Sequence, residues 1–215
     1  MKPYPVILSA PSGAGKTTIA RKLLERRGDL GYSVSCTTRQ QRPGELDGRD
    51  YHFLTTEQFL AERDAGAFAE WAEVHGNHYG TLRREVERVL ASGKHCLMDI
   101  DVQGARQFAE AFPETVLVFI LPPSGEVLLR RLNGRGSEDR DKLLVRLRNA
   151  RAEIGDVARY HYVVVNDDLE QAIERVGSII DAEGVRHDRV HTLEEQVGAL
   201  IAQLEQEITG IQRGD

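Results

Sequence analysis

The chain has 215 residues, a formal net charge of −6 and a pI of about 5.7. Its 40% hydrophobic and 29% charged residues and its mean hydropathy of −0.40 are typical of a soluble globular protein and exclude a disordered chain. The acidic balance excludes the basic groove that a nucleic acid requires, so we expect no nucleic-acid partner.

Targeting, redox and metal signals are few. No apolar run approaches membrane-spanning length and no signal-peptide core follows the start, so we expect a cytoplasmic protein without membrane contact. Cys36 and Cys96 lie far apart without a C-x-x-C pair, which favours reduced thiols. His187 and His191 lack the H-E-x-x-H context, and we expect no transition metal.

The first elements are a strand, a glycine-bearing loop and a helix. An apolar run at residues 5–8 precedes the loop Ser9-Ala-Pro-Ser-Gly-Ala-Gly-Lys-Thr-Thr18, and a helix-compatible segment follows. Glycines there let backbone N–H groups reach phosphate oxygens beside the positive end of a helix. The order therefore predicts a phosphate-binding loop, with Lys16 on the outer phosphates and Thr17 on Mg²⁺.

One position departs from the loop pattern G-x-x-x-x-G-K-[ST], because Ala10 replaces its first glycine. An alanine is harmless there if its backbone is extended and costly if φ must be positive. The alternative interpretation of the loop alone is an ordinary turn between a strand and a helix.

The pattern at about 33–82 predicts a small insertion in the core, which we expect to form a small mixed sheet with antiparallel strands. Its expected parts are an extended segment at 32–38, turns at Pro43-Gly44 and Asp47-Gly48, a strand at 51–54, a helix at about 55–64 that begins at a capping box, and strands at 68–74 and 78–81.

Helices and apolar strands alternate through the rest of the chain. We expect helices at about 82–90, 104–111, 126–132, 139–154 and 169–180, strands at 94–101, 115–121 and 160–165, and a final amphipathic helix at 192–211. This order predicts an α/β fold with a parallel sheet flanked by helices. We expect a core (about 1–32, 83–125 and 151–190), the insertion (33–82) and a helical lid (126–150) within one domain.

The motifs together resemble the guanylate kinase family over nearly the whole chain. Each is weak alone, but their order and spacing are specific. They are Ser9-Ala-Pro-Ser-Gly-Ala-Gly-Lys16, Ser33-Val-Ser-Cys-Thr-Thr-Arg39, Arg42-Pro-Gly-Glu45, Asp47-Gly-Arg-Asp-Tyr-His-Phe53, Glu70-Trp-Ala-Glu-Val-His-Gly-Asn77, Tyr79-Gly80, Asp99-Ile-Asp-Val-Gln-Gly104, Gly134-Arg-Gly136 and Val165-Asn-Asp-Asp168. The resemblance implies a nucleoside-monophosphate-kinase-like fold that transfers the γ-phosphoryl group of ATP to GMP, and to dGMP, in purine nucleotide metabolism.

The resemblance also implies how GMP is held. Its phosphate would contact Arg39, Arg42, Tyr51 and Tyr79, and its base would contact Ser35, Glu70, Thr81 and Asp101. The acceptor phosphate is largely ionised at neutral pH because its second pKa is about 6, so no general base is needed. Guanine offers N–H donors that suit carboxylate acceptors, and adenine would leave those carboxylates unpaired.

On the ATP side, the resemblance implies contacts from the loop and from the end of the last strand. The expected residues are Ser12, Gly13, Ala14, Gly15, Lys16, Thr17 and Thr18, with Asn166 and Asp167 beside adenine. Asp99 would act on Mg²⁺ through a water. Arg135 and Arg146 would be lid arginines that join Lys16 and Arg42 in catalysis. For Arg130, Arg131, Arg140, Arg148 and Arg151 we favour a solvated helix face.

Two alternatives remain open from the sequence. One is a guanylate-kinase-like binding module without catalysis, and the other is a related P-loop kinase for a sugar phosphate. His78 and Leu82 depart from the family pattern at positions where a tyrosine and a hydroxyl are common. The stripe of the final helix fits either a packing cap or a homo-oligomer contact.

Overall fold

A computed structural model describes residues 2–74, 76–133, 140–190 and 192–213. Its central sheet is parallel throughout, with the strand order β2 (Leu30–Tyr32), β7 (His95–Asp99), β1 (Pro5–Ser9), β8 (Val116–Leu121) and β9 (Tyr162–Val165). The predicted α/β fold with a parallel sheet is confirmed. The extended segment expected at 32–38 begins at the last residue of β2, Tyr32, and contains a separate strand of the second sheet that begins at Cys36.

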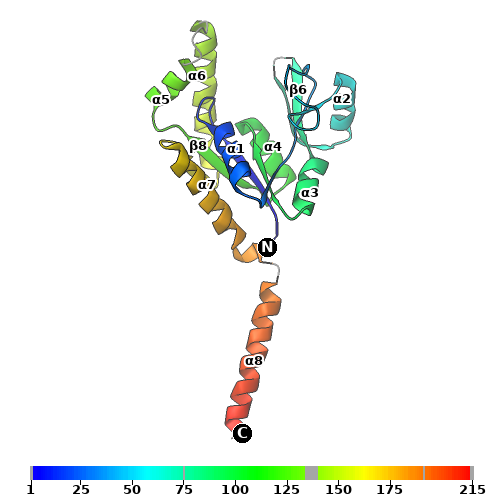
Figure 1. The fold of residues 1–215 in the computed structure, drawn as a ribbon, viewed down its shortest axis with the longest axis vertical. Coiled ribbons are helices and arrows are strands. Elements are labelled where there is room, and N and C mark those ends of the chain that lie inside the picture. The colour runs from blue at the N-terminus through cyan, green and yellow to red at the C-terminus, as the bar shows by residue number, and fades with distance from the viewer. Residues whose placement is uncertain (1, 75, 134–139, 191, 214–215) are drawn as a thin grey trace.

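Both faces of this sheet are covered by helices. β1 shows why its sequence is a continuous apolar run: Val6 and Leu8 belong to one core cluster and Ile7 to the other. The first cluster packs under α1 (Lys16–Arg26) and α7 (Leu169–Gly184), and the second under α3 (Arg83–Ala91) and α4 (Val102–Ala111). The loops at the carboxyl ends of the strands are thereby held on a rigid base (Figure 1).

A second, smaller sheet has the order β4 (His52–Phe53), β3 (Cys36–Thr37), β6 (Asn77–Leu82) and β5 (Phe68–Val74). It packs with α2 (Thr56–Asp64), where Phe59 stacks on Phe68 at 4.4 Å. Thr55 and Gln58 form the predicted capping box of α2. The expected mixed sheet is confirmed. β6 pairs antiparallel with β3 and with β5, whereas β3 and β4 run parallel because the chain between them crosses over through turns at Gly44 and Gly48.

The segment expected to form the lid contains α5 (Gly125–Asn133) and the first part of α6 (Arg140–Gly155). These helices share a small cluster built on Leu128, Leu132 and Ala150. Gly134-Arg-Gly136, and with it the predicted Arg135, lies outside the described residues.

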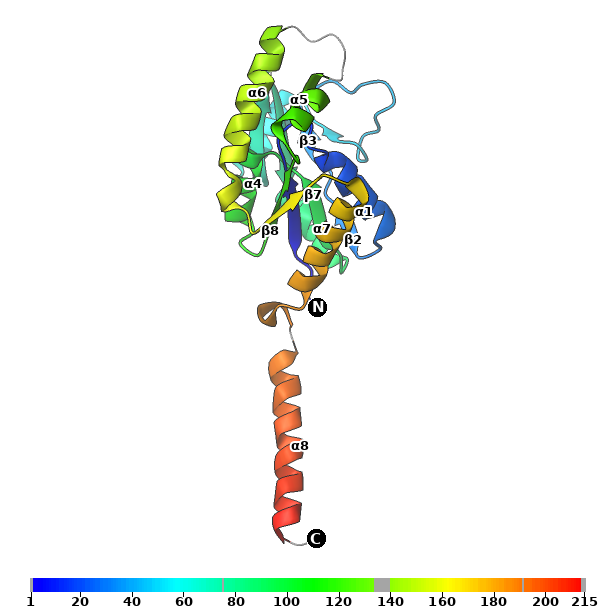
Figure 2. The same ribbon diagram turned by 90° about the vertical axis from the view of Figure 1, so that its left-hand side faces the viewer.

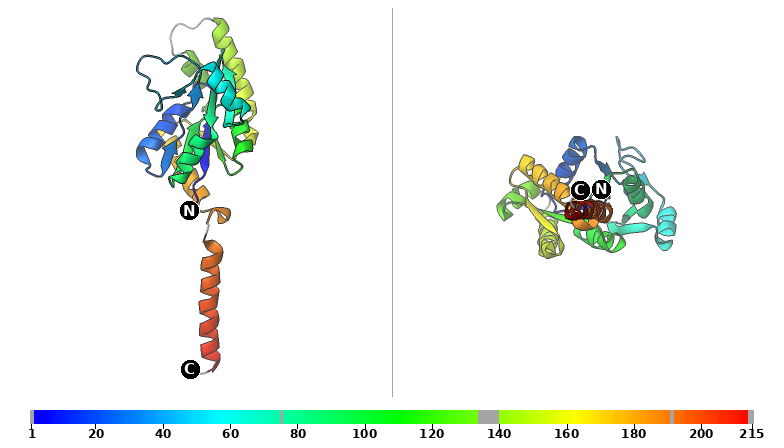
Figure 3. Two further views of the ribbon diagram at one scale, coloured as in Figure 1. Left: turned by 90° about the vertical axis from the view of Figure 1, so that its right-hand side faces the viewer. Right: turned by 90° about the horizontal axis from the view of Figure 1, so that it is seen from below.

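The last helix, α8 (Leu193–Arg213), extends away from the rest of the molecule (Figures 1 and 2). Seen from below, it projects from the base of the body near the N-terminus (Figure 3). Short 3₁₀ turns at Val157–Arg159 and His187–Arg189 precede β9 and α8. In the described part of the chain, no helix has both the length and the apolar content to cross a membrane.

Each sheet holds one cysteine. Cys36 lies in β3 and Cys96 in β7, and both are free and buried. Burial raises the pKa of each thiol to about 12.

Candidate active site

The phosphate-binding loop depends on glycine at Gly15. This residue is the N-cap of α1 and has φ 97°, which side chains disfavour. A Cβ at this position would also lie 2.5 Å from the Asn166 side-chain nitrogen. That nitrogen donates a hydrogen bond to the Ala14 carbonyl at 2.7 Å, so the residue after β9 fixes the position of the loop. Asn166 is buried, and its amide is engaged with the loop rather than directed to solvent.

Ala10, which departs from the loop pattern, is buried and belongs to the larger core cluster. Its methyl group therefore adds apolar contact beneath the loop. Gly13, with φ 84°, takes the left-handed conformation that the loop needs.

Lys16 opens α1 among four carboxylates. Burial lowers the pKa of Lys16, while Asp99, Asp101, Glu153 and Glu70 each act to raise it. Glu70 and Asp101 come from the guanine-directed set, so charges of both predicted substrate sites act on Lys16.

Asp99 lies at the end of β7 and is held by two hydroxyls. Thr17 donates a hydrogen bond to one carboxylate oxygen at 2.7 Å, and Tyr32 donates a longer one of 3.4 Å to the other. Oxygen ligands of this kind fit Mg²⁺, so the donor set suits the predicted ion. Tyr32 was not predicted as a site residue.

The guanine-directed residues Ser35, Glu70 and Thr81 lie together on β5, β6 and the segment before β3. Thr81 donates a hydrogen bond to Glu70 at 2.6 Å, and the Ser35 and Thr81 hydroxyls lie 3.3 Å apart. The Glu70 residue is only 8% exposed. Burial, reinforced by the charge of Asp101, raises the pKa of Glu70 to about 7.

Asp101 approaches the same set from α4. One of its carboxylate oxygens accepts a hydrogen bond from the Gly104 amide at 2.7 Å and caps the helix. The other oxygen has no hydrogen bond to a described residue and is available to a base. Gly104 also makes room for Glu70, because a Cβ at Gly104 would lie 2.9 Å from a Glu70 carboxylate oxygen.

The phosphate-directed residues gather around Glu45. Arg39 donates hydrogen bonds of 2.9 and 3.1 Å to its two carboxylate oxygens, and the Arg42 amide donates one of 2.8 Å. The Arg39 guanidinium lies 5.4 Å from the Tyr51 ring centroid, and the Tyr51 and Tyr79 rings meet edge to face at 6.2 Å. The four predicted residues therefore lie in one region. The exposed Arg42 guanidinium makes no hydrogen bond or ion pair with another described residue.

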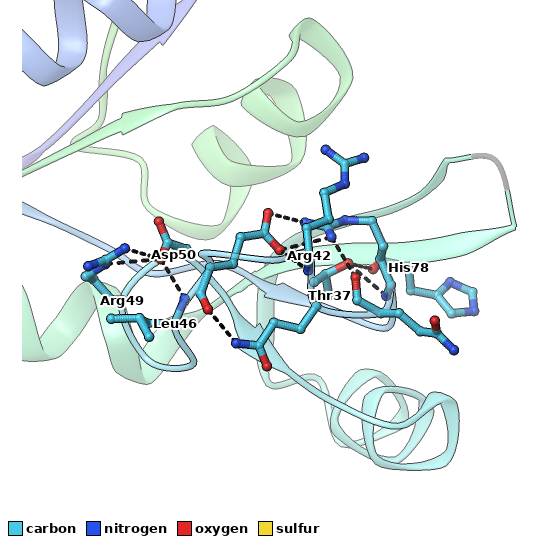
Figure 4. Close-up of polar contacts among 10 residues, drawn as sticks. Thr37, Arg42, Leu46, Arg49, Asp50 and His78 are labelled. Carbon is cyan, nitrogen blue, oxygen red and sulfur yellow. Dashed lines mark hydrogen bonds and ion pairs between the residues drawn. The ribbon is translucent and has the colours of Figure 1, made fainter.

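Further hydrogen bonds hold the loop that carries these arginines (Figure 4). Thr37 donates to the His78 carbonyl at 3.0 Å, and Asp50 accepts from the Leu46 amide at 2.8 Å. The His78 ring stacks on Phe59 at 5.1 Å. The histidine that replaces the family's tyrosine therefore supports the second sheet.

The lid-side residues differ in how closely they approach the loop. Arg146 donates hydrogen bonds to the Ser12 hydroxyl at 3.3 Å and to the Leu132 carbonyl at 3.2 Å. Arg131 is exposed, as expected for a solvated helix face, and it also donates hydrogen bonds of 3.4 Å each to the Ala14 and Asn166 carbonyls, because α5 passes beside the loop.

Three other site-associated residues have less prominent roles in the described contacts. Asp167 is exposed and lies 3.6 Å from Arg175. The hydroxyl-bearing Thr18 is exposed on α1. Leu82, the second departure from the family pattern, is buried with Phe59 and Phe68 and serves packing.

Four residues near the site carried no role in the sequence prediction. Tyr32 acts through Asp99, which is distant in sequence, Gly104 acts through a single missing Cβ, and Glu45 acts through the nearby Arg39 and Arg42. Glu153 of α6 lies at the edge of a cavity of about 810 Å³ between α4 and α6, together with Asp101. Burial raises the pKa of Glu153. For Glu45 and Gly104 the available signal was their place within the quoted motifs.

Comparisons with known proteins identify the family of this chain. The guanylate kinase family model matches residues 2–183. A guanylate kinase of Chelativorans sp. (strain BNC1) is 50% identical over 199 residues, which cover 92% of this chain and 91% of that protein. A guanylate kinase of Bartonella henselae is 48% identical over 198 residues, which cover 92% and 89%.

A solved structure gives the same answer for the fold. The crystal structure of guanylate kinase from Anaplasma phagocytophilum matches with a TM-score of 0.74 at 37% identity, and covers 92% of this chain and 94% of that chain. The chain therefore belongs to the guanylate kinase family, as its motifs predict, and it is an enzyme of that family.

Proposed function

We propose that this enzyme transfers the γ-phosphoryl group of ATP to GMP, and to dGMP, at the site between the phosphate-binding loop and the second sheet. Membership of the guanylate kinase family supports ATP and GMP as the substrates. The single observation that carries the proposal is the buried Glu70, which lies beside Thr81 and Ser35 and acts electrostatically on Lys16. A buried carboxylate acceptor suits the N–H donors of guanine and is costly to leave unpaired.

On the donor side, the loop amides and Lys16 hold the ATP phosphates, and Arg146 approaches them from α6. Thr17 and Asp99 would hold Mg²⁺, which when bound spreads the negative charge of the transferring phosphoryl group. Asn166 keeps the loop in place from behind. We assign Asp167 to the rim of the adenine site and Arg135 to the lid.

On the acceptor side, Arg42 presents a guanidinium to the GMP phosphate without first breaking a described side-chain contact. Arg39, Tyr51 and Tyr79 complete that phosphate site. Since the acceptor is already ionised, these residues overcome the repulsion between two anions and no side chain has to remove a proton.

The division of the chain follows from these roles. We infer that the insertion at about 33–82, which holds the second sheet, moves when GMP binds. Residues of about 126–150 close over ATP, and the remaining core keeps its position. A cytoplasmic location accords with the use of small nucleotides and stays a prediction.

A coupled assay of ADP release tests the substrate choice. We expect GMP to be the best acceptor, dGMP to be used, and AMP and ribose bisphosphate to be rejected. Turnover of none of them would favour a binding module without catalysis, and a preference for ribose bisphosphate would favour the sugar-phosphate kinase.

Variants test the residue roles in the same assay. We expect Lys16→Ala, Arg42→Ala and Arg135→Ala each to lower kcat by orders of magnitude without a change in melting temperature. Arg130→Ala is the control, because Arg130 lies in α5 of the lid and has no proposed contact with either substrate. Near-normal turnover in one of the first three variants would refute that residue's role.

A further inference from the structure

Tyr32 places a hydroxyl beside the metal-directed Asp99. It is the last residue of β2, the edge strand of the central sheet. Tyr32 pairs with Leu97 of β7, and Asp99 lies two residues further along β7. Side chains two residues apart on a strand share a face, so Tyr32 and Asp99 are diagonal neighbours on the face that α1 covers. Thr17 of α1 reaches the same carboxylate from that helix.

The Asp99 carboxylate is held at both oxygens. Thr17 donates a hydrogen bond to Oδ2 at 2.7 Å, and Tyr32 donates one to Oδ1 at 3.4 Å. Rotation about the last bond of an aspartate side chain is only loosely restricted, so one hydrogen bond leaves the carboxylate plane free to turn and a second one fixes it. Hydrogen bonds of an active site are often long before the substrates bind, which fits the greater length of the Tyr32 contact. The Tyr32 contact therefore restricts the direction of the second oxygen.

The Tyr32 hydroxyl keeps its proton at neutral pH. Burial raises the pKa of Tyr32, and the charges of Asp99 and Tyr51 raise it further. The hydroxyl is therefore a donor toward the carboxylate. The influence of Tyr51, one of the phosphate-directed residues, means that the hydroxyl also lies near the GMP side of the site. Among the described residues, however, the hydroxyl makes a hydrogen bond with Asp99 and none with Tyr51, which favours a role through Asp99.

We propose that Tyr32 is a positioning residue that directs the Asp99 carboxylate toward the Mg²⁺ site. The inference rests on the proposed function, in which Asp99 acts on the ion through a water. The Asp99 oxygen that accepts from Tyr32 still has a second lone pair, so it remains open to that water. Loss of an outer partner of this kind typically lowers metal affinity by about 10- to 100-fold. Because the Tyr32 contact is long, its loss should have an effect near or below the lower end of that range.

Manganese binding tests the proposal, because Mn²⁺ suits the same oxygen ligands as Mg²⁺ and free Mn²⁺ is measured by electron paramagnetic resonance. In the complex of the full chain with a non-hydrolysable ATP analogue, we expect Tyr32→Phe, which keeps the ring, to weaken Mn²⁺ binding by about threefold to tenfold. The Mg²⁺ concentration that gives half-maximal turnover should rise by the same factor, with the Michaelis constant for GMP unchanged at saturating Mg²⁺. Tyr162→Phe is the matched control and should leave Mn²⁺ binding unchanged, because it removes a phenol that donates to Glu183 at 2.5 Å from the amino end of β9, away from the site.

A chain that carries Asp99→Asn shows whether Tyr32 acts through Asp99. We expect Asp99→Asn to weaken Mn²⁺ binding, and Tyr32→Phe to cause little further loss in that chain. Four results would each overturn the inference and leave the proposed function intact: unchanged Mn²⁺ affinity in Tyr32→Phe, losses that multiply in the double variant, an equal loss in Tyr162→Phe, or a change in the Michaelis constant for GMP alone. Unchanged Mn²⁺ affinity in Asp99→Asn would instead remove Asp99 from the metal site, and this inference with it.

Discussion

Glu70 connects base recognition to the solution pH. Its pKa of about 7 means that the free enzyme holds a mixture of neutral and charged carboxyl groups near neutrality. The N–H donors of guanine favour the charged form, so GMP binding should release a proton. We predict that GMP affinity falls about tenfold per pH unit well below pH 7, beyond the loss due to the GMP phosphate itself.

Calorimetry in buffers of different ionisation enthalpy measures that proton release directly. In Glu70→Gln only the titration of the GMP phosphate remains, and the Michaelis constant for GMP rises while that for ATP is unchanged. Identical pH profiles for the two proteins would show that guanine is read by another group.

The same residue affects the stability of the free protein. Because the folded-state pKa of Glu70 lies above the ordinary glutamate value of 4.5, its contribution to folding is fully present below about pH 4.5 and is lost as pH rises through about 7. Above that range the buried charge costs roughly 3 kcal/mol at most. Glu70→Gln should therefore melt at a higher temperature than the wild type at pH 8, with the difference shrinking towards pH 5. A constant difference across this range would contradict the assignment.

Gly104 has a role defined by the space it leaves. A methyl group there would lie 2.5 Å from Ile100 and 2.9 Å from the Glu70 carboxylate, so both must shift. We predict that Gly104→Ala raises the Michaelis constant for GMP at least several-fold and leaves that for ATP unchanged. Gly28→Ala, at a position with open space, is the matched control. Equal GMP kinetics in Gly104→Ala would show that Glu70 is not held by this contact.

At the scale of elements, the loop between β3 and β4 is ordered by one carboxylate. Glu45 binds the Arg39 guanidinium and the Arg42 amide together, so both arginines depend on its charge. We predict that Glu45→Gln raises the Michaelis constant for GMP and lowers kcat. Glu73→Gln, an exposed strand residue, is the control. Steady-state GMP kinetics of the two variants test this prediction. Equal effects in both variants would show that Glu45 does not contribute to the site.

The elements themselves were largely predictable because their signals are local. The periodicity of apolar residues and the capping residues predicted the helices, and the continuous apolar runs predicted the strands of the parallel sheet. The parallel pairing of β3 with β4 was not predictable in this way. Each of these strands has two residues, and their direction depends on how the chain between them crosses.

The site was predictable only in part for a similar reason. The motif residues carried over one by one from the family resemblance. Tyr32 and Arg131 reach the site through contacts with residues far along the chain, namely Asp99 and Ala14. No spacing in the sequence reports such contacts.

For the whole molecule, the end of the folded body can be located by its contacts. Arg189 is buried, lies 3.8 Å from the Tyr4 ring centroid and forms an ion pair with Glu183 at 3.2 Å. We predict that a chain ending at Val190 keeps its GMP turnover and its melting temperature at low protein concentration. A chain ending at Gly184, which lacks both Arg186 and Arg189, should melt at a clearly lower temperature because the buried Glu183 loses its two arginine partners and keeps only the Tyr162 hydroxyl. Similar melting of the two truncated chains would show that the 3₁₀ turn contributes nothing.

The two buried cysteines can report the local opening of each sheet. Because one thiol lies in each sheet and neither reacts while buried, a thiol reagent modifies Cys36 only when the smaller sheet opens and Cys96 only when the larger one does. Labelling rates measured by mass spectrometry in single-cysteine chains therefore give separate opening rates for the two halves of the enzyme. A saturating level of GMP should slow labelling at Cys36 more than at Cys96.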